Sequence, residues 1–344
     1  MPPLSFGTNT GKNVLVADFL DQVDVELPVL GGHAQLTLAQ AWNESELAPF
    51  LADTDVMILF HDIARISDAT LAAAPRLKAI VRAGVGYNNV DIEAAGMRGI
   101  VTCNVPDYGS EEVADHSIMF LLALARQLGP CDQSIRDGKW DYKVADAAPR
   151  LRGKTLGIVG CGRIGTATAL RAKAFGLDVV FYDPYLPDGV DKALGIRRAR
   201  TLDELLPQCQ FLSLHCYLDA DSQHLINSQT LAKLPKGAYL INTARGPVVK
   251  QDDLVEALAS GHIAGAGIDV FEREPMDDDR LRTRPNVFLT PHSAFYSREG
   301  FVELRRKTAE EACRIILGQP PRNPVNLGYL VNPRTPVTQP RARV

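Results

Sequence analysis

Short runs of consecutive apolar residues alternate with helical patterns along most of the chain. In the N-terminal third the apolar runs lie at 13–18, 56–60, 77–84 and 99–104. Helical patterns lie between them, near 45–52, 67–74 and 91–96. Uninterrupted apolar runs are typical of strands buried on both faces of a parallel sheet, and helices are the connections that such a sheet needs. The pattern predicts a doubly wound α/β domain.

A second alternating series begins near residue 156. Its apolar runs lie at about 156–159, 179–182, 211–215, 238–242, 265–269 and 287–289. Helical patterns such as 164–175 and 251–259 separate them. Six strands are the number expected of a complete dinucleotide-binding sheet, so this series predicts a second parallel-sheet domain of the Rossmann type.

The segments that join and follow the two series have a different pattern. The stretch 112–128 is apolar on nearly every face, which predicts a helix buried either between domains or against another subunit. From Gly129 to Lys154 the chain has the pattern of an extended connection. A long helix is predicted at 298–317, and the tail 333–344, rich in Pro and Arg, is expected to be loosely ordered at its end.

Composition restricts the class of protein. At 344 residues the chain exceeds the size at which one hydrophobic core stops growing, which favours two domains. A net charge of -4 gives no indication of binding to nucleic acid or a membrane surface, and the longest apolar run, 118–125, is too short to span a bilayer. Six scattered cysteines without a C-x-x-C pair predict neither a metal site nor a disulfide framework. We therefore expect a soluble protein of the reducing cytoplasm.

Gly160, Gly162 and Gly165 form G-x-G-x-x-G between a predicted strand and a predicted helix. Glycines in that context let the backbone approach a pyrophosphate at the N-terminus of the helix. The next strand ends at Asp183, 18 residues after the last glycine, where a carboxylate accepts hydrogen bonds from ribose hydroxyls and repels a 2'-phosphate. The spacing predicts NAD rather than NADP as the cofactor. The basic run 197–200 is interpreted as solvated surface.

Three residues with complementary chemistry follow the ends of successive strands in the second series. Arg245 follows the run 238–242, Glu274 follows 265–269, and His292 follows 287–289. Because the carboxyl ends of parallel strands meet at one edge of the sheet, these side chains are expected to lie together. An arginine binds the carboxylate or carbonyl of a 2-oxo acid, a histidine exchanges a proton with the carbonyl oxygen, and a glutamate orients the imidazole.

Four segments in this order, "GIVGCGRIG" (157–165), "INTARGPVV" (241–249), "DVFEREP" (269–275) and "TPHSA" (290–294), resemble the D-isomer-specific 2-hydroxyacid dehydrogenase family. The resemblance covers nearly the whole chain. Further segments, including "IVRAGVGYNNVDIEAAGMRGIVTCNVP" (80–106) and "SLHCYL" (213–218), are similar to the branch that includes the C-terminal binding protein corepressors.

The resemblance implies a discontinuous, flavodoxin-like substrate domain formed by 1–111 and 295–344, with the NAD-binding Rossmann domain at 112–294 inserted. It places Arg245, Glu274 and His292 at the family's catalytic positions. Cofactor-binding positions are implied for Gly160, Gly162, Arg163, Ile164, Gly165, Asp183, Cys216, Thr243, Ala244, Asp269 and His292. Substrate-binding positions are implied for His61, Arg82, Val85, Gly86, Arg245 and Phe295, with the backbone N–H groups of Val85 and Gly86 facing a carboxylate. The resemblance also implies a homodimer.

The sequence departs from the pattern of the resemblance at two positions. Phe295 stands where the corepressor branch has a tryptophan, which affects the expected substrate, and Lys250 replaces an acid at a position expected to be peripheral. Aromatic side chains at 87, 108, 295 and 296 suggest a pocket that accepts a larger or apolar substrate side chain. Apart from the 2-hydroxyacid dehydrogenase, the sequence leaves open an NAD(H)-sensing corepressor-like protein with weak dehydrogenase activity. A formate dehydrogenase is disfavoured by Glu274, because formate oxidation releases no alcohol proton.

Several other histidine, glutamate and cysteine side chains are expected to have structural roles. His215 and His224 are not accompanied by an acid and an arginine from adjacent strand ends, and His116 lies on the predicted buried helix, so all three are interpreted as structural histidines. Glu272, which does not precede a proline, is interpreted as a surface charge. Cys216 is interpreted as a wall of the adenine pocket because no base is placed to activate its thiol.

Overall fold

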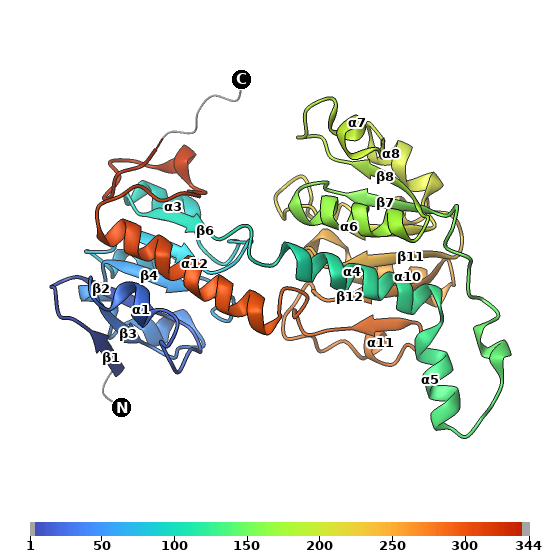
Figure 1. The fold of residues 1–344 in the computed structure, drawn as a ribbon, viewed down its shortest axis with the longest axis horizontal. Helices are drawn as coiled ribbons and strands as arrows, with labels where there is room; N and C mark the ends of the chain where they lie inside the picture. Colours follow the sequence, from blue (N-terminus) through green and yellow to red (C-terminus); the bar gives the residue numbers. More distant parts are fainter. Residues whose placement is uncertain (1–3, 339–344) are drawn as a thin grey trace. The chain divides into compact units, whose positions relative to one another are not determined.

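The computed structural model describes residues 4–338, and they form two compact units (Figure 1). Unit 1 comprises the chain up to Gly109 and from Ser297 onward, and unit 2 is Ser110–Tyr296. The last six residues of the tail that we expect to be loosely ordered, 339–344, lie outside the described range. No helix within 4–338 has both the length and the apolar character needed to cross a membrane.

Unit 1 contains a six-stranded sheet with the strand order β1-β3-β2-β4-β5-β6. The strands are β1 (Leu4–Gly7), β2 (Asn13–Val16), β3 (Gln35–Leu38), β4 (Val56–Leu59), β5 (Ala79–Arg82) and β6 (Val101–Asn104). All neighbours pair in parallel except β1, which lies antiparallel at the edge. Without β1 the order is that of a flavodoxin-like sheet. The doubly wound prediction is confirmed, and the sequence pattern missed two of the six strands, β1 and β3.

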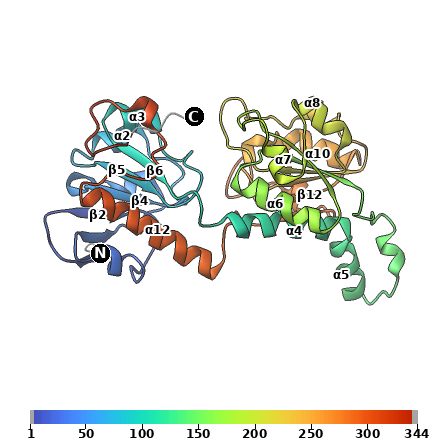
Figure 2. The same cartoon turned by 45° about the horizontal axis from the view of Figure 1, so that its top comes forward.

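Helices cover this sheet. They are α1 (Leu27–Leu30), α2 (Asp68–Ala72), α3 (Ile92–Met97) and α12 (Arg298–Ile316). The predicted helix near 45–52 forms two 3-10 turns instead, Glu44–Leu47 and Leu51–Asp53. The side chain of Ser297 caps α12 by accepting a hydrogen bond from the N–H of Gly300 at 2.8 Å. The C-terminal helix packs along β4 and β5, so it completes the fold of the N-terminal strands (Figures 1 and 2).

Unit 2 contains a seven-stranded, all-parallel sheet with the order β13-β12-β11-β10-β7-β8-β9. The strands are β7 (Thr155–Val159), β8 (Asp178–Tyr182), β9 (Arg197–Arg198), β10 (Phe211–Leu214), β11 (Ala238–Asn242), β12 (Ile263–Ile268) and β13 (Val287–Leu289). The order reverses between β7 and β10, which is the switch point where ligands bind in open α/β sheets. The six predicted strands are confirmed, and the seventh is the two-residue β9.

Alternate residues of the strands in unit 2 face two different helical layers. Phe211, Tyr239 and Ile241 pack on the side of α4 (Ser110–Ala125) and α6 (Arg163–Ala174), whereas Leu212 and Leu240 pack with Leu254 and Leu258 of α10 (Gln251–Ala259). Five shorter helices are α5 (Leu128–Arg136), α7 (Val190–Leu194), α8 (Leu202–Leu205), α9 (Ser228–Leu231) and α11 (Asp279–Arg282). Burial on both sides explains why the strands are continuous apolar runs.

The helix predicted over 112–128 differs from the observed structure in two respects. It packs through Phe120, Leu121 and Leu124 against the sheet of its own unit, so its apolar character reflects burial within unit 2. It also ends at Ala125, because Gln127 adopts a left-handed backbone conformation (φ 53). The extended connection predicted from Gly129 begins instead as α5, whose Pro130 lies in the first turn, where a proline removes no intrahelical hydrogen bond.

Candidate active site

The glycine-rich turn joins β7 to α6. Gly160 has φ +86, and a Cβ there would lie 2.7 Å from the backbone N of Cys216. A Cβ on Gly165 would lie 2.1 Å from the carbonyl oxygen of Gly160, so the close approach of helix to turn requires glycine. A Cβ on Gly162 would meet no atom within 4 Å. The first and third glycines therefore serve the packing of the turn, whereas the second faces open space.

Asp183 follows β8 directly and is buried. Its Oδ2 accepts a hydrogen bond from the N–H of Cys161 at 2.9 Å, and its Oδ1 accepts one from the N–H of Tyr185 at 3.0 Å. The carboxylate is thus bound to the glycine-rich turn itself. Each carboxylate oxygen has a second lone pair, so both retain the capacity to accept a hydroxyl hydrogen bond.

These residues fit a dinucleotide. Arg163 and Ile164 are the first residues of α6, whose N-terminal N–H groups have no partner within the helix. The open space at Gly162 lets a pyrophosphate approach these groups, and Asp183 lies at the end of the neighbouring strand. Cys216 lies on the other side of the turn, and burial raises the pKa of its thiol to about 11, which disfavours the thiolate.

The basic run 197–200 is not simply solvated surface. Arg198 lies in β9 with 7% of its side chain exposed, and its Nη2 donates to the carbonyl oxygens of Asp183 and Leu186, both at 2.8 Å. Its guanidinium lies over the ring of Phe181, 5.6 Å from the centroid. Arg198 therefore holds the chain that follows Asp183. Arg200, in contrast, pairs with Asp188 in an exposed position.

Arg245 lies three residues beyond β11. Its Nη1 donates to the carbonyl oxygen of Ala244 at 2.7 Å, and its own carbonyl oxygen accepts from Nδ2 of Asn242 at 3.0 Å. A Cβ on the next residue, Gly246, would lie 1.8 Å from the backbone of Phe271, so only glycine lets this turn contact the chain after β12. Thr243 is buried, and its Oγ1 lies 2.9 Å from Oγ of Ser117.

Glu274 and His292 form a hydrogen-bonded pair. Nδ1 of His292 lies 2.8 Å from Oε2 of Glu274, and Oε1 of Glu274 accepts from the N–H of Phe271 at 3.0 Å. Burial raises the pKa of Glu274, but the hydrogen bond and charge of His292 outweigh it, with a smaller contribution from the Arg245 charge, and the pKa is lowered overall. The structure thus brings together the three residues that the sequence places at successive strand ends.

Asp269 anchors the loop that carries His292. It is 1% exposed, and its oxygens accept from Oγ1 of Thr290 and from the N–H groups of Ser293 and Ala294 at 2.5, 2.8 and 3.0 Å. Its carbonyl oxygen also accepts from the N–H of His292 at 2.9 Å. His292 has φ 52, a conformation that few residues other than glycine adopt, and these hydrogen bonds hold it there.

Two histidines interpreted as structural have partners that the sequence does not reveal. Nε2 of His116, on α4, lies 3.0 Å from Oγ1 of Thr290, and burial lowers the pKa of its imidazole. His224 pairs with Glu272, which is therefore not an isolated surface charge. His215 is partly buried, its Nε2 lies 2.9 Å from Oγ of Ser213, and burial lowers the pKa of its imidazole to about 3.

The residues implied for substrate binding in unit 1 cluster around β4 and β5. Asn89 connects them, because its Nδ2 donates to the carbonyl oxygens of Phe60 and Ile63, on either side of His61, and its Oδ1 accepts from Nε of Arg82 at 3.4 Å. Asn104 donates to the carbonyl oxygen of Val85 at 2.7 Å, which fixes the turn that continues into Gly86.

Aromatic residues adjoin His292 in unit 2. The rings of His292 and Phe295 are perpendicular, with centroids 6.3 Å apart, and Phe295 makes a similar contact with Tyr296. Tyr87 and Tyr108 belong to unit 1, where Tyr108 is buried.

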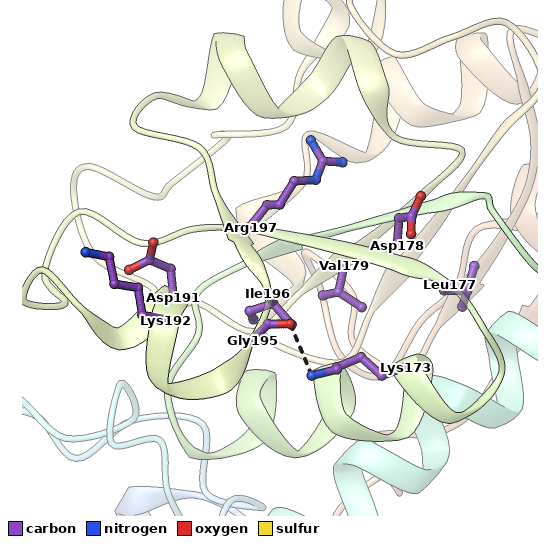
Figure 3. A pocket seen from close by; sticks show the side chains of 9 residues that line it. All are labelled: Lys173, Leu177, Asp178, Val179, Asp191, Lys192, Gly195, Ile196 and Arg197. Carbon is purple, nitrogen blue, oxygen red and sulfur yellow. Dashed lines mark hydrogen bonds between the residues drawn. The ribbon is translucent and has the colours of Figure 1, made fainter.

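A hollow at the edge formed by β8 and β9 contains none of these residues. It is lined by the ends of α6 and α7 and by the outer strands, and Nζ of Lys173 donates across it to the carbonyl oxygen of Gly195 at 3.1 Å (Figure 3). Its lining combines cations of Lys192 and Arg197 with carboxylates of Asp178 and Asp191. The mixed charge gives no preference for an anionic or cationic ligand.

Comparison with known proteins identifies relatives of both units. Residues 118–294 match the family model described as D-isomer specific 2-hydroxyacid dehydrogenase, NAD binding domain. The chain is 35% identical over 314 residues to D-3-phosphoglycerate dehydrogenase of Methanocaldococcus jannaschii, covering 91% of this chain and 59% of that protein. It thus spans about three fifths of the length of the curated relatives it matches.

Two solved structures are similar over most of both chains. D-lactate dehydrogenase from Aquifex aeolicus, complexed with NAD and lactic acid, superposes with a TM-score of 0.80 at 30% identity, covering 89% of this chain and 96% of that one. The NADPH-dependent glyoxylate/hydroxypyruvate reductase of Sinorhizobium meliloti, in complex with NADP and malonate, gives 0.83 at 29% identity, covering 96% and 100%.

Proposed function

Because the chain belongs to the D-isomer specific 2-hydroxyacid dehydrogenase family, we propose that it is an NAD-dependent oxidoreductase that interconverts a 2-oxo acid and its D-2-hydroxy acid. The observation that carries this proposal is the 2.8 Å contact between His292 and Glu274, with the Arg245 charge acting on the same carboxylate. This reaction needs a group that carries the proton, a second group that orients it, and a cation that binds the substrate carboxylate.

The three residues have distinct roles in the proposed reduction. Glu274 accepts the hydrogen bond of Nδ1 and favours the imidazolium, so that Nε2 of His292 gives its proton to the carbonyl oxygen of the substrate. Arg245 binds the substrate carboxylate with its planar guanidinium. When bound, the nicotinamide ring supplies the hydride in this direction and accepts it in the reverse direction. In oxidation, His292 takes the hydroxyl proton back.

Asp183 favours NAD over NADP in this proposal. Its buried carboxylate accepts hydrogen bonds from the ribose hydroxyls and would repel a 2'-phosphate at the same place. Arg198 does not supply a competing phosphate site, because its guanidinium is bound to the carbonyl oxygens of Asp183, Leu186 and Pro187. Thr243, Ala244 and Asp269 are proposed to adjoin the nicotinamide end.

Unit 1 is proposed as the substrate-binding unit and unit 2 as the NAD-binding unit. The backbone N–H groups of Val85 and Gly86 would bind the carboxylate, with Arg82 and His61 as further contacts. Phe295, beside His292, supports an apolar substrate side chain. Relatives are named for phosphoglycerate, lactate and glyoxylate, which are acids with chemically different side chains.

We further propose a homodimer that works in a reducing cytoplasm, where the six free cysteines stay reduced. The similarity to the corepressor branch supports an alternative in which the protein senses NAD(H) and turnover is incidental. The intact His292–Glu274 pair favours the enzyme.

NADH oxidation against a panel of 2-oxo acids, repeated with NADPH, tests the proposal. Wild-type protein should turn over at least one acid with a preference for NADH. His292→Ala should lose about 10²- to 10⁴-fold in kcat, and Arg245→Lys should lose most of kcat/KM because an ammonium cannot reproduce a bidentate contact. His33→Ala, in an exposed position of unit 1, is the control. Undiminished turnover by His292→Ala would exclude the mechanism, and negligible turnover on every acid, with NADH-dependent capture of a protein, would favour the alternative.

A further inference from the structure

A second histidine–glutamate pair lies in unit 2 beside the first. Nε2 of His224 lies 2.5 Å from Oε1 of Glu272, with side chains 40% and 32% exposed. The pair joins two loops that are 48 residues apart in the sequence, one after β10 and one after β12. Nothing in the proposed mechanism uses it.

The backbone at His224 is bound to the turn that follows Arg245. The N–H of His224 donates to the carbonyl oxygen of Pro247 at 2.7 Å. Two more hydrogen bonds continue this contact, from Ile226 N to Val248 O at 3.0 Å and from Lys250 N to Ile226 O at 2.8 Å. His224 therefore begins a short segment that pairs in parallel with the segment starting at Pro247, two residues after Arg245.

Glu272 is bound to the same turn from the other side. Its Oε2 accepts from the N–H of Gln251, the first residue of α10, at 3.3 Å. The backbone of Phe271 and Glu272 also packs directly on Gly246, where no Cβ fits. Within the loop, the N–H of Phe271 donates to Oε1 of Glu274 at 3.0 Å. A displacement of Glu272 would therefore act on Gly246, next to Arg245, and on the support of Glu274.

We propose that the His224–Glu272 pair is a clamp that positions Arg245 and Glu274 relative to each other for reaction. The inference rests on the proposed dehydrogenase function, and it makes His224 and Glu272 positioning residues, because neither is proposed to touch the substrate. Partly exposed ion pairs contribute little to global stability, so the clamp is expected to act on the geometry of the site and not on the melting temperature.

The test compares variants that keep or remove one hydrogen bond. His224 has φ 52, and glutamine occupies this conformation twice in the chain, at Gln40 and Gln127 (both φ 53). His224→Gln retains a donor at the position of Nε2, whereas His224→Met has nearly the same length without one. Glu272→Ala removes the acceptor. Arg273→Ala is the matched control, because its side chain in the same loop is 83% exposed.

For the oxo acid, kcat/KM should fall about tenfold or more in His224→Met and Glu272→Ala, while KM for NADH stays at the wild-type value. His224→Gln and Arg273→Ala should be close to wild type. The double variant, His224→Met with Glu272→Ala, should be no worse than either single variant, because the two remove the same contact. Wild-type kinetics in His224→Met, or an equal loss with both substrates, would overturn the clamp.

Amide hydrogen exchange separates failure of this inference from failure of the proposed function. In the NADH-bound protein, peptides covering 244–251 and 269–275 should exchange faster in Glu272→Ala and His224→Met than in Arg273→Ala. If wild-type protein turns over no oxo acid, the dehydrogenase proposal fails while faster exchange still supports the clamp. Exchange equal to that of the control overturns the clamp, whatever the activity.

Discussion

Nδ1 of His292 and Oε2 of Glu274 lie 2.8 Å apart, and the second oxygen of Glu274 accepts from the N–H of Phe271. The carboxylate is therefore oriented by two donors from different segments. Because its hydrogen bond to His292 and the neighbouring charges lower the pKa of Glu274, this side chain is a carboxylate at neutral pH.

Glu274→Gln should slow oxo-acid reduction. The amide keeps the shape of the side chain but not its negative charge, so it stabilises a positive imidazole on its partner less than the carboxylate does. The kcat should therefore fall about tenfold or more, while KM for NADH stays at the wild-type value. Glu256→Gln, at an exposed position of α10, is the control. An unchanged kcat, measured by NADH oxidation, would contradict the assigned role of Glu274.

Alanine substitutions at Gly162 and Gly165, in the same turn, should affect different properties, the first NADH binding and the second stability. Gly162→Ala meets no protein atom, so the melting temperature should stay unchanged, but the added methyl occupies the space that a pyrophosphate needs and the Kd for NADH should rise at least about tenfold. Gly165→Ala places its Cβ 2.1 Å from the carbonyl oxygen of Gly160 and should destabilise unit 2 itself. Thermal melting and NADH fluorescence titration measure both effects. Normal NADH affinity in Gly162→Ala would exclude this turn as the pyrophosphate site.

Asp18 in unit 1 should make stability depend on pH. It is fully buried, and burial raises its pKa to about 6, although the N–H groups of Phe60 and Ile63 donate to its oxygens and partly oppose this shift. The folded state then binds more protons than the unfolded state between pH 3.8, the ordinary pKa of an aspartate side chain, and about pH 6. The Asp18 contribution to stability is full below the lower value and is lost as pH rises through the higher one.

The comparison of wild type with Asp18→Asn, which does not titrate, isolates this effect. The wild-type urea midpoint, relative to that of the variant, should decrease between pH 4 and 7, by the equivalent of about 3 kcal/mol or less. Circular dichroism at several pH values measures both midpoints, and Asp53→Asn at an exposed position of the same unit is the control. A difference that stays constant with pH would show that Asp18 titrates normally.

Local motifs account for what the sequence predicts of the site. Gly160 to Asp183 forms one continuous strand–turn–helix–strand unit, so spacing alone places its parts. Arg245, Glu274 and His292 are distant in sequence, but each follows an apolar strand, and parallel strands bring their carboxyl ends to one edge. The prediction therefore needs only the strand order and not the details of the loops.

The sequence pattern does not predict which side chains contact one another in irregular segments. His116 and Thr290 are 174 residues apart, and His224 and Glu272 are 48 apart, and neither pair is marked by a strand end at both positions. Arg198 lies in a strand of two residues, too short for any periodicity, so its burial is invisible in the sequence. Pro130 favours the prediction of a turn, but it lies in the first turn of α5, where a proline is compatible with a helix.

The apolar surface of α5 and the loop after it leads to the last prediction. These segments extend away from the sheet of unit 2 (Figures 1 and 2). Trp140 and Tyr142 are 93% and 85% exposed, and Leu128 and Ile135 are also exposed. Large aromatic and aliphatic side chains gathered on one extension are typical of a surface that another protein covers, and the proposed homodimer supplies a second copy for it.

Replacement of Trp140 and Tyr142 together by serine should weaken the proposed dimer. Buried aromatic side chains carry much of the binding energy of interfaces, about 2 kcal/mol or more each, so the dimer Kd should rise about 1,000-fold or more. Neither side chain belongs to the core of unit 2, so the melting temperature of the separated subunit should change little. Trp42→Ser, which removes an exposed tryptophan from unit 1, is the matched control. Light scattering over a range of concentrations should give twice the chain mass for wild type and for the control. The double variant should give a mass near that of one chain. A wild-type mass of one chain, or an unchanged dimer in the double variant, would contradict the assignment of this surface.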